Sequence, residues 1–172
     1  MQRRHIIGFL PAGLAVSAAA PLGGCGFALR QAPSFAFATL YSPQISNSSA
    51  GIELKRSLES NGKVQVNANG VGPEKADVTL DVLLDQREKT VVGLNASGQV
   101  REFQLRIRFK FRLRNRQGKE LIADTEILQQ RDISFNESAV LAKEAEEALL
   151  YREMQSDIVQ QIMRRLAAVK AI

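Results

Sequence analysis

The chain has 172 residues, with 23 Lys or Arg against 18 Asp or Glu, one His and one Cys. His5 lies in a segment predicted to be removed, so the mature chain has no Ser-His-Asp triad, no Cys-His pair and no zinc ligand set, and no phosphate-binding glycine motif is present. Composition therefore predicts a protein that is not an enzyme and needs no cofactor; carboxylate-only mechanisms survive this test, but no paired acids stand in apolar surroundings.

Residues 1–24 have the layout of a secretory signal peptide. Arg3 and Arg4 precede an apolar stretch, residues 6–22, that contains no charge, and small residues follow it. A membrane-spanning helix is the alternative, but this stretch is short for a span and contains Pro11 and Pro21. The twin arginine leaves the export route open between the general and the twin-arginine pathway.

Cys25 follows "LGG", which resembles the lipobox of bacterial lipoproteins, although Gly23 stands where Ala or Ser is more usual. That resemblance implies cleavage before Cys25, a diacylated thiol and an acylated amino terminus. Several acyl chains anchor a protein essentially permanently. Resemblance to sorted lipoproteins implies that, with Gly26 rather than Asp after the cysteine, the destination is the outer membrane, facing the periplasm. An ordinary cleaved signal with a stray thiol is the alternative, because no second Cys exists for a disulfide.

The mature chain is long enough for one domain. Removing residues 1–24 from 172 leaves 148, and Lys plus Arg falls to 21 against 18 acids, a net charge of about +3. On an exported protein, this charge argues against nucleic acid as a partner and favours anionic lipid. We expect residues 25–34 to form a lipidated tether and residues 35–172 a single domain.

The first half of the domain predicts two short strands around a helix. Residues 35–41 alternate Phe35, Phe37 and Thr39 with small residues, which is typical of a strand. A helix begins near residue 50, with Ser48 or Ser49 as its cap, and ends at Gly62. A short strand, residues 63–66, follows.

Three longer strands come next, with turns at "NASG" and "NRQG". In the first, residues 76–85, we expect Val82 and Leu84 on an apolar face and Asp81 and Asp85 on the other. The second, residues 101–114, alternates apolar and basic residues without a break, the pattern of a half-buried strand. The third covers residues 119–135.

A long helix from about Ser138 completes the domain. Its apolar residues recur every three or four positions and predict one buried stripe from Leu141 through Ile158 to Val169. We therefore predict an α+β fold: a two-layer sandwich in which a mixed, mostly antiparallel sheet of four to five strands packs two helices on one face.

The basic side chains of residues 101–114 predict one of two roles. They are Arg106, Arg108, Lys110, Arg112 and Arg114. On a face that the helices leave uncovered, they would form an anionic site for phosphates, which Arg binds bidentately. Alternatively, the acids of the neighbouring strands, Asp77, Asp81, Asp85, Asp124 and Glu126, neutralise them. Both readings stay open.

Three segments together resemble the lipopolysaccharide-assembly lipoprotein family LptE: "CGFALR", "SGQVREFQLRIRFKFRL" and "AVLAKEAEEALLYREMQSDIVQQIMRRL". The resemblance covers essentially the whole mature domain. It implies a lipoprotein of the outer membrane that lies as a plug in the lumen of the β-barrel LptD, helps that barrel fold, and binds lipopolysaccharide during transport to the cell surface. A subunit of another envelope lipid or outer-membrane-protein machine is the second hypothesis.

The resemblance implies few site residues. Lys143 matches the helix lysine that the family associates with lipopolysaccharide binding, and Arg101 is close to the turn where the family has a second basic residue and this chain has Ala96. Arg106 and Arg108 are further candidates for phosphate contacts. For Lys143, the alternative is an ordinary surface lysine paired with Glu146 or Glu147.

Overall fold

The computed structural model describes residues 33–60 and 62–172, which belong to the unit Ala32–Ile172. The predicted signal peptide, Cys25 and most of the tether lie outside the described residues. The elements are β1 (Thr39–Tyr41), η1 (Ile45–Asn47), α1 (Ser49–Glu59), β2 (Gln65–Val66), β3 (Val78–Leu94), β4 (Val100–Asn115), β5 (Glu120–Ser134), η2 (Glu137–Ala139) and α2 (Val140–Ala167).

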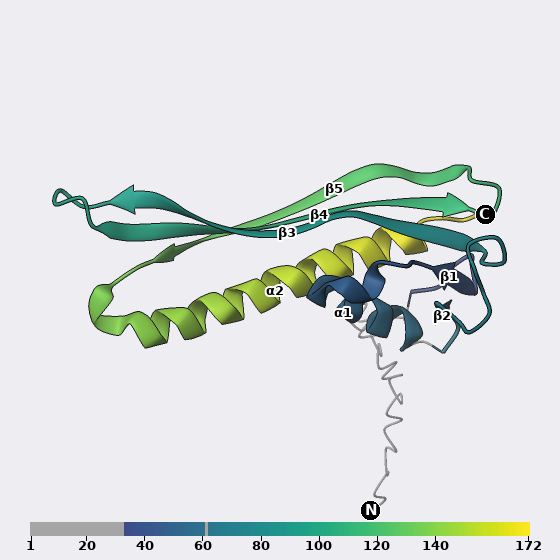
Figure 1. The fold of residues 1–172 in the computed structure, drawn as a ribbon, viewed down its shortest axis with the longest axis horizontal. Helices are drawn as coiled ribbons and strands as arrows, with labels where there is room; N and C mark the ends of the chain where they lie inside the picture. Colours follow the sequence, from purple (N-terminus) through teal and green to yellow (C-terminus); the bar gives the residue numbers. More distant parts are fainter. Residues whose placement is uncertain (1–32, 61) are drawn as a thin grey trace, which may run out of the picture. The chain divides into compact units, whose positions relative to one another are not determined.

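The five strands form one mixed sheet in the order β2-β1-β3-β4-β5. β1 is parallel to β2 and to β3, whereas β3, β4 and β5 are antiparallel neighbours. Both helices lie on the same side of this sheet (Figure 1). The predicted α+β sandwich is confirmed. The face of the sheet on which the helices pack is called the helix-covered face, and the other face of the sheet is called the open face.

The turns of both long hairpins have the same structure, in which an Asn stands three residues before a Gly. The Asn95 side chain accepts hydrogen bonds from the backbone N–H groups of Ser97 and Gln99, at 3.0 and 2.9 Å. Gly98 has a φ of 80°, a conformation that glycine adopts without strain. Asn115 and Gly118 repeat the arrangement between β4 and β5. The two predicted turns are thus confirmed.

The core lies between β4 and the second half of α2. Every apolar residue of β4 from Leu105 to Leu113 is essentially buried, and it packs in one cluster with buried residues of both helices. Those of α2 are Met154, Ile158, Val159, Ile162 and Leu166. Ser48 caps α1, because its side chain accepts from the Gly51 N–H at 3.0 Å.

The first half of α2 departs from the prediction. Leu141 is 82% exposed, and Ala145 and Ala148 are exposed as well, so the buried stripe begins only near Met154. The reason lies in β3, whose helix-covered positions here are taken by Arg87 and Lys89. Long polar side chains fill this space and keep their charged ends in water, so the apolar residues of this half of α2 find little apolar surface to pack against.

A bulge in β3 changes which side chains share a face. Val82 lies opposite Phe111 while Leu84 lies opposite Lys110, so Leu83 is an extra residue and the alternation inverts after it. The prediction was therefore wrong for two positions: Leu84 belongs to the open face and Asp85 to the helix-covered face. β3 also continues nine residues past the predicted end, to Leu94.

Among the described residues, no helix has the length and apolar character that crossing a membrane requires.

Candidate functional site

The basic row of β4 lies on the open face, opposite acids on both neighbouring strands. Glu126 of β5 accepts from Arg108 at 2.8 Å, and Asp124 pairs with Lys110 at 3.1 Å. Asp81 of β3 bridges Arg112 and Arg114, at 3.2 and 2.8 Å. Cross-strand pairing, the second of the two readings, is therefore what the geometry shows for four of the five bases.

Arg106 is the exception in this row. Its Nε donates to the Gln104 side chain at 2.7 Å, and no ion pair to it is found within the described ranges. Arg108, by contrast, is already paired with an acid. Its hydrogen bond to Glu126 lowers the pKa of the Glu126 carboxyl and raises the pKa of the Arg108 guanidinium. Of the two candidates on the open face, Arg106 is therefore the one whose charge is not already paired with an acid in the described part of the chain and can bind a further anion.

Two acids expected in this row have other roles. Asp77 accepts from the backbone N–H groups of Ala38 and Thr39, at 3.0 and 2.9 Å, and lies 3.6 Å from Arg116. Burial works to raise the pKa of Asp77, but these hydrogen bonds outweigh it and lower the pKa. Asp85 points to the helix-covered face, away from the basic row, because the bulge at Leu83 inverts the alternation. Asp77 thus fastens β1 to the start of β3.

Lys143 lies in the first turn of α2 and contacts the end of β5. Its Nζ donates to Glu146 at 2.8 Å and to the Ser134 hydroxyl at 3.0 Å. The expected helix pairing is present, but the contact with Ser134 also ties the start of α2 to the sheet. The side chain of Lys143 is only 22% exposed, so it is more than a freely solvated lysine.

Arg101 lies at the same connection between β5 and α2 as Lys143 but lines a different pocket. Its side chain borders an open pocket of about 300 Å³ with Asn136, Glu137 and Ser138, the connection between β5 and α2. Its carbonyl accepts from the Phe135 N–H at 2.7 Å. The four candidates therefore form two groups: Arg101 and Lys143 beside the start of α2, and Arg106 and Arg108 on the open face.

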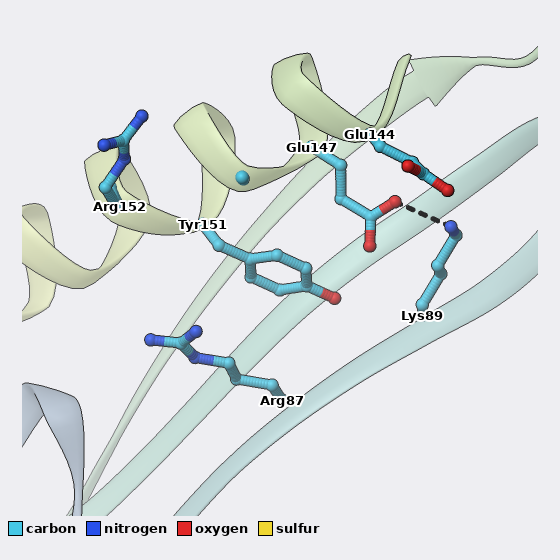
Figure 2. A pocket seen from close by; sticks show the side chains of 7 residues that line it. Arg87, Lys89, Glu144, Glu147, Tyr151 and Arg152 are labelled. Carbon is cyan, nitrogen blue, oxygen red and sulfur yellow. Dashed lines mark hydrogen bonds and ion pairs between the residues drawn. The ribbon is translucent and has the colours of Figure 1, made fainter. Parts of the chain in front are cut away.

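A polar groove lies between β3 and α2 (Figure 2). It was not predicted from the sequence. It has a volume of about 640 Å³ and is lined by Arg87, Lys89, Glu144, Glu147, Ala148, Tyr151 and Arg152. Lys89 pairs with Glu147 at 2.6 Å, and the Arg87 guanidinium lies over the Tyr151 ring, 5.4 Å from its centroid. Burial, and then the charge of Glu147, raise the pKa of Tyr151.

The groove is braced from α1. One nitrogen of Arg87 donates to Ser49 at 2.6 Å and to Gln155 at 2.5 Å, and the Tyr151 hydroxyl donates to the Glu88 carbonyl at 2.8 Å. β3, α1 and α2 are thus joined at one place. Residues 86–90 read Gln-Arg-Glu-Lys-Thr and are all polar, so no apolar alternation could have revealed Arg87 and Lys89 as strand residues.

Comparisons with known proteins identify the family. The family model described as LptE, lipopolysaccharide-assembly, matches residues 37–166. A solution structure of the uncharacterized lipoprotein B from Nitrosomonas europaea is similar at 35% identity, with 84% of this chain and 92% of that chain covered and a TM-score of 0.69.

Two crystal structures share the fold at lower identity. The rare lipoprotein B from Shewanella oneidensis is 23% identical, covers 76% of this chain and 92% of its own, and has a TM-score of 0.60. A minor lipoprotein from Acinetobacter baumannii is 19% identical, covers 78% and 94%, and has a TM-score of 0.58. The curated proteins gave no match. The family model spans most of the chain and the Nitrosomonas lipoprotein agrees with it, so this chain belongs to the lipopolysaccharide-assembly family LptE.

Proposed function

We propose that this protein forms a complex with the outer-membrane β-barrel LptD, acting as its plug and assembly partner, and binds lipopolysaccharide during transport to the cell surface. The observation that carries the proposal is the match of residues 37–166 to the lipopolysaccharide-assembly family. Members of that family are envelope lipoproteins, and the structural neighbours named above are lipoproteins as well. The role is binding and assembly, without a chemical step of its own.

The proposal places the protein on the periplasmic face of the outer membrane, with its folded part in the barrel lumen. Cys25, the sole thiol, carries the lipid anchor. With His5 removed in the signal, the mature chain holds no histidine, which fits a subunit that makes and breaks no bond.

Lys143 is the first residue proposed to contact the lipid A or core phosphates, with Arg101 beside it. Both stand near the connection between β5 and α2: Lys143 contacts Ser134, and Arg101 borders a pocket with Asn136, Glu137 and Ser138. An ammonium pairs with phosphate from any approach. On the open face, Arg106 is the better second contact, because Arg108 already donates two hydrogen bonds to Glu126 and such bidentate pairs are the stronger ones.

Co-purification tests the complex. A tagged full-length chain is isolated from detergent-solubilised outer membranes, and its partners are identified by mass spectrometry. We expect one β-barrel in stoichiometric amount, identified as LptD and stable in detergent. Isolation with a different envelope complex would favour the second hypothesis, and isolation without any partner would contradict both.

Binding to lipopolysaccharide is tested separately with Lys143→Glu. The charge reversal should weaken binding several-fold, and added salt should weaken binding of the unmodified protein, since exposed charges are screened. Lys170→Glu is the matched control, because Lys170 is exposed beyond the end of α2. Circular dichroism and recovery of the barrel complex check that the fold is intact. Binding that responds to neither the reversal nor the salt would remove Lys143 from the site.

A further inference from the structure

A second pocket opens under the start of α2, next to the polar groove. It has a volume of about 240 Å³ and a mostly apolar lining, to which Phe103, Ile133, Phe135 and Val140 contribute. The rings of Phe103 and Phe135 meet edge to face, with centroids 5.3 Å apart. Strands β4 and β5 thus supply the floor and α2 one wall of an aromatic pocket, a lining suited to an aliphatic chain.

Two lysines from different elements line this aromatic pocket. Lys89 comes from β3, and its Nζ lies 4.3 Å from the centroid of the Phe103 ring. Lys143 comes from α2 and touches the strand residue Ser134. An apolar pocket with a few converging charged groups has the composition of a binding site for an amphiphile, whose chain enters the pocket while its headgroup stays at the rim.

We propose that the aromatic pocket holds one alkyl chain of an anionic amphiphile, and that Lys89 together with Lys143 binds its phosphate. This inference rests on the proposed function and deepens it, because it names the part of the ligand that this end of the protein takes. Lys89 is the new residue in the assignment. Each methylene that enters the pocket raises affinity about fourfold, which makes chain length a measurable variable.

Glu144 and Glu147 also line the pocket, and both lysines have glutamate partners that a phosphate can replace. Lys89 is paired with Glu147 and Lys143 with Glu146, in pairs whose side chains are between 22% and 47% exposed. Such partly exposed pairs are weak. A phosphate offers more charge and more acceptor oxygens than one carboxylate, so it replaces both glutamates at the lysines. The start of α2 buries little apolar surface, which lets it shift to admit the chain.

Photo-crosslinking tests the pocket on the full-length protein in lipid nanodiscs. The probe is decyl phosphate with a diazirine in its chain, and the labelled residues are mapped by mass spectrometry. We expect label at Phe103, Phe135 and Val140, competition by unlabelled decyl phosphate, and competition at least tenfold weaker by decyl maltoside, decyl trimethylammonium or inorganic phosphate. Octyl phosphate should compete roughly sixteenfold less well than decyl phosphate.

Variants separate the cations from the pocket itself. Lys89→Met should lower labelling several-fold and Lys89→Arg should restore most of it, while Lys170→Met, with the same loss of charge elsewhere, should change nothing. Val140→Trp should fill the space and abolish labelling, with circular dichroism as the check on folding. Equal competition by the maltoside or by the trimethylammonium compound, full competition by inorganic phosphate, or label elsewhere would overturn the proposal.

The outcomes are independent of the complex with the barrel. If LptD co-purifies and the pocket is not labelled, the pocket assignment fails and the proposed function stands. If the pocket is labelled and no barrel co-purifies, the pocket remains an amphiphile site and the proposed function fails.

Discussion

Ile158 lies at the centre of the contact between α2 and the sheet, and truncating it tests the whole packing arrangement. Its side chain is fully buried, in one cluster with Phe109 and Phe111 of β4. Ile158→Ala removes three carbons at about 0.8 kcal/mol each, so lost transfer alone costs about 2.4 kcal/mol. The cavity left behind adds to this, which places the expected loss in unfolding free energy within about 2–5 kcal/mol.

The assay is urea denaturation of the purified protein, followed by far-ultraviolet circular dichroism. The midpoint should fall while the slope of free energy against urea stays constant, because the exposed surface on unfolding hardly changes. Leu141→Ala on the same helix is the control: at 82% exposure it should change stability by less than about 0.5 kcal/mol. Equal effects of the two substitutions would refute the reasoning that only the second half of α2 belongs to the core.

Three further outcomes are expected. Gly51→Ala should destabilise the folded protein by about 1–3 kcal/mol or more, because a Cβ at this position collides with the Ile45 carbonyl. The neighbouring change Ala50→Gly should cost about 1 kcal/mol. An unchanged denaturation midpoint of the Gly51 variant would contradict the close contact. Cys25→Ala should give unprocessed precursor without acyl label, measured by labelling with a fatty acid and by intact mass, and label at another residue would contradict the anchor. Asp77→Asn should lower the free energy of unfolding at neutral pH by roughly 1 kcal/mol and make stability less dependent on acid. Because the pKa of Asp77 is lowered in the fold, the ionised carboxylate stabilises the protein above its ordinary pKa of 3.8. This contribution is lost as the pH falls through the lower pKa of the folded state. Identical denaturation profiles of the Asn variant and the unmodified protein between pH 2 and 7 would contradict it.

The sheet was predictable where its alternation is continuous. Residues of β4 from Phe103 to Leu113 keep one phase, and the structure places every apolar one toward the helices. β3 was predicted too short because residues 86–90 are all polar, so Arg87 and Lys89 fell outside the expected strand. The extra residue Leu83 was also missed, which put Leu84 and Asp85 on the wrong faces. A bulge depends on the pairing with the neighbouring strand, which periodicity in one segment does not contain.

The candidate site was predictable in residue type but not in pairing. Five bases at every second position imply compensation, yet which acid meets which base follows from strand register. Asp81 and Glu126 lie in register with the row, whereas Asp77 binds the backbone of β1 instead. The exposed first turns of α2 were missed for a related reason, since an apolar stripe shows a preference for burial but not the presence of a partner surface.

The short pairing between β1 and β3 has a consequence for amide hydrogen exchange. The two strands meet only at Leu40 with Val78 and Tyr41 with Thr79, and no other described strand pairs with that edge of β3 as it continues to Leu94. Every second N–H beyond Thr79 therefore points to an unpaired edge, and protection should fall from the β1 end toward the hairpin tip. Local opening can then reshape the end that carries Lys89 and Lys143, while the end where β1 pairs with β3 keeps its slowest-exchanging amides.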